Sequence, residues 1–266
     1  FRPVTALTHF IDYQLWPDKP LLHHAHSLAW MVLACWAVRR LYAATDLPLI
    51  ALGLAVFFFV VDDGHAMSVS WIANRNALLA VFFGGLAVQT YISWRRKAGP
   101  AHWPIALFTL SLFSAEAGLC AFGYLVAWTW VYEKEWHRRF SALAPMVVVI
   151  TLWRAIYNIM GYGAWGTGLY NDPISDPLGF LSALWQRLPI LVLGQWGQLP
   201  TDISVGLPPG LLLMLAGIGG CLFIFLGWQF RALLKEDPRA QFWCLGMLFS
   251  AIPLCATVPM NRLLIF

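Results

Sequence analysis

The amino-acid sequence predicts an all-α protein, a polytopic transmembrane helical bundle. Sixty per cent of the 266 residues are hydrophobic and 11% are charged, whereas soluble domains carry about 25% charged residues. The mean hydropathy is +0.66. The apolar runs are long and unbroken, while a transmembrane barrel would need segments of roughly ten residues with alternating polarity. We therefore expect most of the chain to lie in lipid.

Charge and cysteine use exclude several other classes. The net charge of +4 does not indicate nucleic-acid binding, because the 17 Lys and Arg residues form short clusters between apolar runs. Such clusters report topology, since cytoplasmic loops are enriched in Lys and Arg. The five cysteines lie in apolar runs without metal-ligand or redox spacing, and we interpret them as buried, inert thiols.

The first half of the chain is predicted to begin with an outer interfacial segment over residues 1–24. Spans are expected at 24–42, 47–61 and 77–94. Residues 103–131 are too long for one crossing of about 20 residues. We expect two short helices there, meeting near residues 114–118, because basic clusters on both sides of this run belong to the same face.

The second half continues with an outward crossing at 142–160. Residues 161–206 are predicted to form an outer loop, rich in turn formers, whose segment 178–196 is an interfacial or re-entrant helix. Crossings at 207–230 and 241–257 bring the total to about eight. The whole chain, 1–266, is read as a single transmembrane domain. It opens on Phe1 and closes inside an apolar run, so we expect it to be truncated at both ends.

The stretch 61–79 concentrates ionisable groups between two apolar runs, with Asp62, Asp63, His65 and Arg75. Such groups are costly to hold at the mouth of a membrane bundle and are functional candidates. Paired carboxylates and a histidine can supply a general base, or ligands for Mg²⁺ or Mn²⁺. An arginine is suited to bidentate capture of phosphate. Taken singly, each residue could instead cap a helix, and the set would also fit the gate of an ion-coupled transporter.

Other polar residues are interpreted individually. Glu116, in SLFSAEAGL, is expected at an outer turn, as a site residue or as a water-exposed acid. Arg154 is expected inside a span, where it should snorkel outward or pair with an acid. The histidines in HHAH (23–26) do not have an established ligand spacing and are interpreted as surface residues. The 15 tryptophans are interpreted as interface anchors.

Three segments resemble GT-C fold glycosyltransferases, and bacterial relatives of protein O-mannosyltransferases in particular. FRPVTALTHF followed by a histidine-bearing span resembles the segment after the first outer loop of that group. SLFSAEAGL resembles its L-x-S-K-E-x-G turn, and residues 259–264 resemble a late arginine motif. The stretch 61–79 is similar to the second outer motif through His65, Val69, Trp71, Ile72, Ala73, Arg75, Leu78 and Leu79. The chain departs from that pattern at Asp62, Met67, Ala77 and Ala115.

The resemblance implies an integral membrane glycosyltransferase. It would transfer a sugar from a polyprenyl-phosphate donor to an acceptor at the outer, periplasmic face of the bacterial inner membrane. An aspartate upstream of Phe1 would be the base, and the expected partners are the bilayer and the lipid-linked donor. The implied catalytic-site residues are Asp62, Asp63, His65 and Glu116. Of these, Asp62, Asp63 and His65 would position the acceptor or a Mg²⁺ or Mn²⁺ ion. The implied lipid-phosphate ligands are Arg75 and Arg262.

The rival interpretation is a non-enzymatic membrane protein. The departures at Met67, Ala77 and Ala115 favour a catalytically degenerate GT-C-like protein. A small transporter is the other alternative. It would be expected to show Gly- or Pro-broken spans in matching halves of the chain, and the sequence lacks that pattern.

Overall fold

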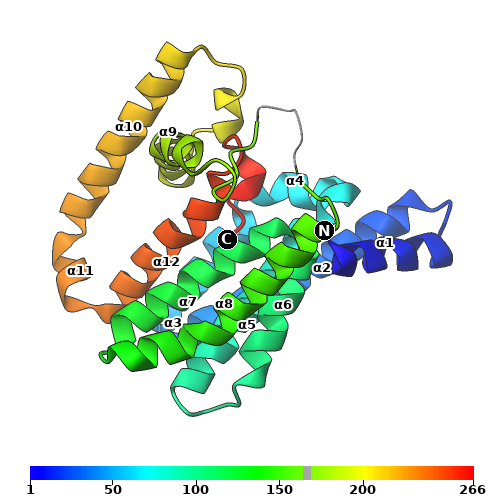
Figure 1. Cartoon of the computed structure of the whole chain (residues 1–266), viewed down its shortest axis with the longest axis horizontal. Helices are drawn as coiled ribbons and strands as arrows, with labels where there is room; N and C mark the ends of the chain where they lie inside the picture. Colours follow the sequence, from blue (N-terminus) through cyan, green and yellow to red (C-terminus); the bar gives the residue numbers. More distant parts are fainter. Residues whose placement is uncertain (164–168) are drawn as a thin grey trace.

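The structure is a computed structural model that describes residues 1–163 and 169–266 (Figure 1). These residues form α-helices and short 3-10 turns and include no strand, which confirms the predicted all-α class. The helices are α1 (Pro3–Leu15), α2 (Pro20–Ala44), α3 (Leu49–Val61), α4 (Gly64–Ser70), α5 (Arg75–Arg95), α6 (His102–Ser114), α7 (Leu119–Tyr132), α8 (Trp136–Ile159), α9 (Pro177–Gly197), α10 (Pro209–Gln229), α11 (Arg231–Glu236) and α12 (Pro238–Leu254). The 3-10 turns are η1 (Ile72–Asn74), η2 (Glu116–Gly118), η3 (Thr201–Ser204) and η4 (Asn261–Leu263).

Within the described ranges, five helices are long and apolar enough to cross a membrane. They are α2, the continuous η1–α5 segment, α8, α9 and α10. The pair α3 and α4, bent by 55°, would make six if it forms one span. The predicted count of about eight is not confirmed, because α6, α7 and α12 have only 13, 14 and 17 residues. A span of the hydrocarbon core needs about 20 residues.

Four helix ends meet at one end of the bundle, which we call the Arg95 end. Arg95 on α5 pairs with Glu133 after α7 at 2.6 Å, and Arg96 pairs with Asp46 after α2 at 2.8 Å. Arg239, at the start of α12, donates to the Asp46 carbonyl at 3.0 Å. These contacts bring the basic residues around Arg95 and Arg239 to the same end of the bundle.

The chain between Arg95 and Glu133 is a helical hairpin, as its length and flanking charges predict. α6 ends at Ser114, η2 forms the turn, and α7 returns to the level of Arg95. On the way, the Thr129 hydroxyl of α7 lies 2.5 Å from the Tyr91 hydroxyl of α5. Both hydroxyls are buried away from water. Their hydrogen bond therefore avoids the cost of leaving a buried polar group without a partner.

The core of the bundle lies between α5, α6, α7, α8 and α12, with Phe108, Trp128 and Phe242 among its buried members. α7 and α12 approach to backbone contact, because a Cβ at Gly123 would lie 2.4 Å from the backbone nitrogen of Ser250. Close approach through a small residue is typical of packed helices in membranes, where dispersion contacts drive association.

α9 lies crosswise to the other long helices (Figure 1). In this view α9 is seen nearly end-on, whereas α8, α10 and α12 are seen from the side. Before α9, Asn171 donates to the Ala256 carbonyl beyond α12, and after α9, Thr201 donates to Asn261. Both ends of α9 are thus tied to the end of the bundle opposite Arg95. Although α9 has the length and apolarity of a span, this placement favours the predicted interfacial or re-entrant helix.

Candidate functional site

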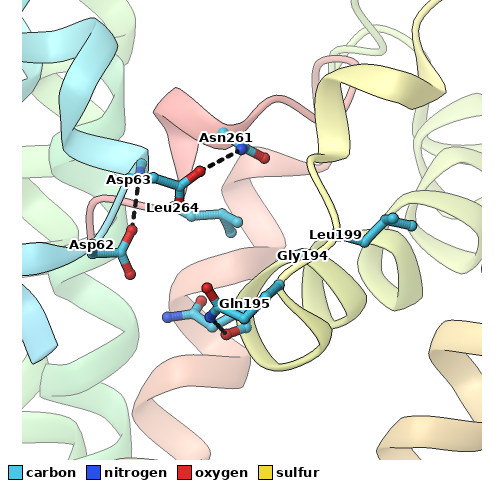
Figure 2. Close-up of a pocket in the computed structure, with 9 residues that line it drawn as sticks. Asp62, Asp63, Gly194, Gln195, Leu199, Asn261 and Leu264 are labelled. Carbon is cyan, nitrogen blue, oxygen red and sulfur yellow. Dashed lines mark hydrogen bonds between the residues drawn. The ribbon is translucent and has the colours of Figure 1, made fainter.

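The turn between α3 and α4 meets the late turn η4 at the end of the bundle opposite Arg95, which we call the Asp62 end. Asn261 Nδ2 donates to Asp63 Oδ2 at 3.4 Å (Figure 2), across 198 residues of sequence. Asp62 Oδ1 accepts from the Gly64 backbone nitrogen at 2.8 Å, which closes the turn on itself. A Cβ at Gly64 would lie 3.2 Å from the Asn261 carbonyl oxygen, so the two turns touch closely.

Asn261 joins this turn to the segment after α9. Its side-chain oxygen accepts from the Thr201 backbone nitrogen at 2.7 Å and from the Thr201 hydroxyl at 2.9 Å. Its backbone nitrogen donates to Asp202 Oδ2 at 3.0 Å. One amide therefore orients three chain segments: the Asp63 turn, η3 and η4.

A small cavity lies between these segments (Figure 2). Its volume is about 20 Å³, close to the space that one water molecule needs. Both predicted acids reach it, together with polar side chains from the C-terminal end of α9. The cavity is lined by Asp62, Asp63, Gly64, Gly194, Gln195, Gln198, Leu199, Asn261 and Leu264.

Arg262 follows Asn261 directly and lies over the indole ring of Trp71, with Cζ 5.5 Å from the ring centroid. A guanidinium within about 6 Å of an indole face is attracted by the ring quadrupole. Arg262 has no ion-pair partner within residues 1–163 and 169–266. Its charge is thus positioned by an aromatic ring and is not neutralised by a carboxylate.

His65 does not line the cavity. It is buried, with 4% of its surface exposed, and its ring centroid lies 4.5 Å from that of Phe59. In the described part of the chain, no group of three or more His, Cys, Asp or Glu side chains could hold a metal ion. The candidate ligands Asp62, Asp63 and His65 are thus not gathered into such a group.

Glu116 lies at the same end of the bundle but is occupied by Arg2. Arg2 Nη2 and Nε lie 2.7 and 2.8 Å from Glu116 Oε2. Burial raises the pKa of Glu116, but the Arg2 guanidinium outweighs it and holds the pKa below its usual value. Thr5 donates to the Ser114 carbonyl nearby at 2.7 Å, so this contact fastens α1 to the α6–α7 turn.

Arg75 is a fully buried charge at this end, with no exposed side-chain surface. Its Nη1 lies 2.6 Å from Oδ2 of Asp12, which is also fully buried. Nε donates to the Ser27 hydroxyl at 3.0 Å and Nη2 to the His23 carbonyl at 2.8 Å. In this geometry Arg75 has no free surface for a lipid phosphate, so that predicted role stays a prediction.

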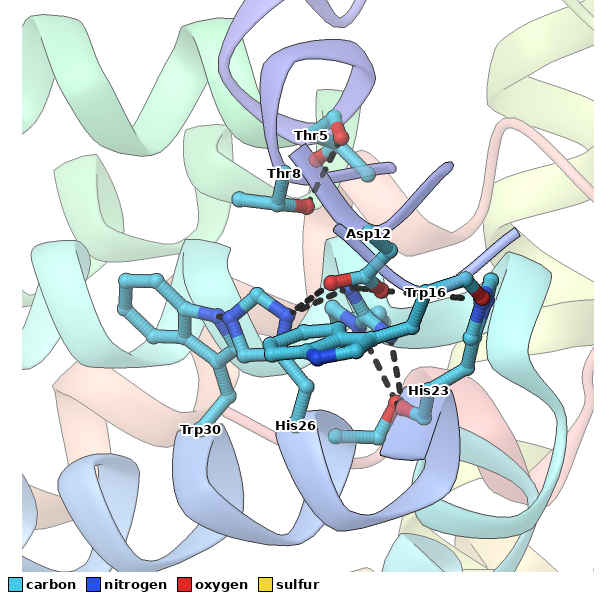
Figure 3. A network of polar contacts seen from close by, with 9 residues as sticks. Thr5, Thr8, Asp12, Trp16, His23, His26 and Trp30 are labelled. Atoms are coloured by element: carbon cyan, nitrogen blue, oxygen red, sulfur yellow. Dashed lines mark hydrogen bonds and ion pairs between the residues drawn. The ribbon is translucent and has the colours of Figure 1, made fainter. Parts of the chain in front are cut away.

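The same network holds α1 against α2 (Figure 3), where Asp12 points from α1 toward His26. Asp12 Oδ1 lies 2.5 Å from His26 Nδ1, and Trp30 donates to His26 Nε2 at 3.0 Å. Burial raises the pKa of Asp12, but the hydrogen bonds with His26 and Arg75 outweigh it and keep the pKa below its usual value. His26 thus keeps 23% of its side chain exposed but is tied into this network.

Two groups at this end were missed by reasoning from the sequence. Asp12 was not among the candidate site residues, although a carboxylate four residues before Trp16 in a half-apolar helix could have indicated a buried partner. Asn261 carries no charge and precedes the predicted Arg262, so its only available signal was its place in that motif. Arg154 pairs with Asp172, which confirms that this span arginine finds an acid.

Comparisons with protein-family models, with curated proteins and with solved structures find no match to this chain.

Proposed function

We propose that this chain is a GT-C-like glycosyltransferase of the bacterial inner membrane, with about eight crossings when its short helices are counted and its site at the periplasmic face. One observation carries the proposal. The Asp62–Asp63 turn and the Asn261–Arg262 turn, far apart in sequence, meet at one end of an apolar bundle. A carboxylate pair beside an unneutralised guanidinium suits a substrate that carries both a reacting hydroxyl and a phosphate.

The proposed reaction moves a sugar from a polyprenyl-phosphate donor. The acceptor hydroxyl oxygen forms a bond to the anomeric carbon as the bond from that carbon to the phosphate oxygen breaks. Asp63 orients the hydroxyl and accepts its proton as the general base. The phosphate leaves on its lipid carrier with the electron pair, and Arg262 holds the resulting anion.

The remaining predicted residues take structural roles in this proposal. Glu116, neutralised by Arg2, anchors α1, and Arg75, neutralised by Asp12, orients the chain that leads from α4 into α5. The cavity at Asp63 is too small for a sugar at about 20 Å³. Donor binding therefore requires η3 and η4 to move away from the Asp62 turn.

The test measures transfer and lipid binding separately in nanodiscs. We expect Asp63→Asn to reduce release of labelled sugar from polyprenyl-phosphate hexoses by about 10²-fold or more, as for loss of a positioned acid–base group. Arg262→Ala should weaken binding of polyprenyl phosphate by about tenfold, the loss of one charge-assisted contact worth about 1.5 kcal/mol.

Matched controls come from the same chain. Arg40 lies 5.2 Å over the Trp36 ring, so Arg40→Ala removes a similar cation–π arginine elsewhere on the bundle. Asp18→Asn removes an exposed acid that follows α1. Unchanged turnover and unchanged lipid binding in both Asp63→Asn and Arg262→Ala would contradict the proposed function.

A further inference from the structure

A second, larger hollow lies at the Asp62 end, beside the α4–η1 connection. It is an open groove of about 530 Å³, within the range of about 300–1,000 Å³ that is usual for small-molecule sites. α1, the first turns of α2 and the chain after α4 contribute its walls. The lining residues are His9, His24, Ser70, Trp71, Ile72 and Ala73.

The lining of this groove is polar and carries no permanently charged side chain. It contains two imidazoles, one hydroxyl and one indole, and no Asp, Glu, Lys or Arg side chain. Burial lowers the pKa of His9, and Arg75 lowers it further, so His9 is neutral near pH 7 and can both donate and accept hydrogen bonds. A phosphate or carboxylate would meet no cation from the lining itself.

Trp71 supplies an exposed aromatic surface, because 48% of it is accessible although Arg262 lies over the ring. An indole ring offers a broad, apolar face of fixed orientation. Ser70 is exposed beside it. An aromatic face flanked by uncharged donors and acceptors is complementary to a sugar ring, which has C–H groups on one face and hydroxyls around its edge.

We propose that this groove binds a neutral sugar ring, stacked on Trp71 and hydrogen-bonded by His9, His24 and Ser70. The identification of this sugar as the acceptor rests on the proposed function. The turn η4 connects the two sites, because Asn261 contacts Asp63 while the next residue, Arg262, contacts Trp71.

The test is saturation-transfer NMR on the chain in nanodiscs, with methyl glucoside and methyl mannoside as neutral probes and inorganic phosphate as the competitor. We expect saturation of at least one glycoside, no competition by phosphate, and at least a tenfold loss of affinity in Trp71→Ala. Trp71→Phe should retain part of the affinity. Trp185→Ala, which removes an 82% exposed tryptophan of α9, is the control and should bind as the unmodified chain does.

Other outcomes overturn the proposal. Equal signals from the unmodified chain and Trp71→Ala would make Trp71 an interface anchor only, and competition by phosphate would make the groove an anion site. If Trp71→Ala lowers the thermal midpoint, His24→Gln with Ser70→Ala provides the second variant, and unchanged affinity there rejects the site. Sugar binding without any transfer from lipid-linked donors would reject the proposed function alone, whereas transfer without binding would reject the groove alone.

Discussion

The buried pair of Asp12 and Arg75 makes the strongest prediction about stability. Both side chains have no exposed surface, and their charged atoms lie 2.6 Å apart. Asp12→Ala removes the only carboxylate that the described chain places against this guanidinium. An uncompensated buried charge costs about 3–5 kcal/mol. For a chain of this size, such a loss lowers the thermal midpoint by about 10 °C.

The assay is thermal unfolding in nanodiscs followed by circular dichroism, with amide hydrogen exchange of α1 as a local readout of its release. Asp18→Ala, an exposed acid near the same helix, is the control and should shift stability by less than about 0.5 kcal/mol. The double variant Asp12→Leu/Arg75→Met removes both charges and should recover most of the loss. Equal midpoints for Asp12→Ala and Asp18→Ala would refute the reasoning.

Three further predictions concern other contacts. His26 and Arg75 lower the pKa of Asp12 below its usual 3.8, against the effect of burial. The Asp12 carboxylate therefore stabilises the fold above about pH 4, and this stabilisation is lost as the pH falls through the lowered pKa. A pH titration of the thermal midpoint should show this loss in the unmodified chain and not in Asp12→Leu/Arg75→Met. Gly123→Ala places a Cβ 2.4 Å from the Ser250 nitrogen and should cost about 1–3 kcal/mol, whereas Gly53→Ala meets nothing within 4 Å and should be neutral or stabilising by thermal unfolding. Asp172→Asn removes the acid paired with Arg154 and should speed proteolysis between α8 and α9, and unchanged cleavage rates would contradict a structural role for that pair.

The parts of the fold that could be predicted from the sequence follow from length and charge. The run 103–131 exceeds one crossing, and the basic residues on both sides require a return to the same face, which yields the α6–α7 hairpin. This inference uses properties that each segment carries by itself.

The polar contacts of the site depend on partners that no local pattern reveals. Asp12 and Arg75 become a buried pair only because α1 folds over α2 and α5, and sequence spacing does not encode that docking. His26 is partly covered for the same reason, with 23% of its side chain exposed. Asn261 organises three segments through one uncharged amide, and a three-residue turn has no periodicity that would identify it. The count of crossings failed to be confirmed because α6, α7 and α12 are short.

The central claim is that the Asp62–Asp63 turn and the Asn261–Arg262 turn meet at one end of the bundle. Its most direct test is oxidative cross-linking in native membranes of Asp63→Cys with Asn261→Cys, after the five native cysteines are replaced by alanine. We predict rapid formation of an intramolecular disulfide in this pair, and none between Asp63→Cys and Arg239→Cys, which lies at the Arg95 end. Absence of the first cross-link, or equal formation of both, would contradict the account.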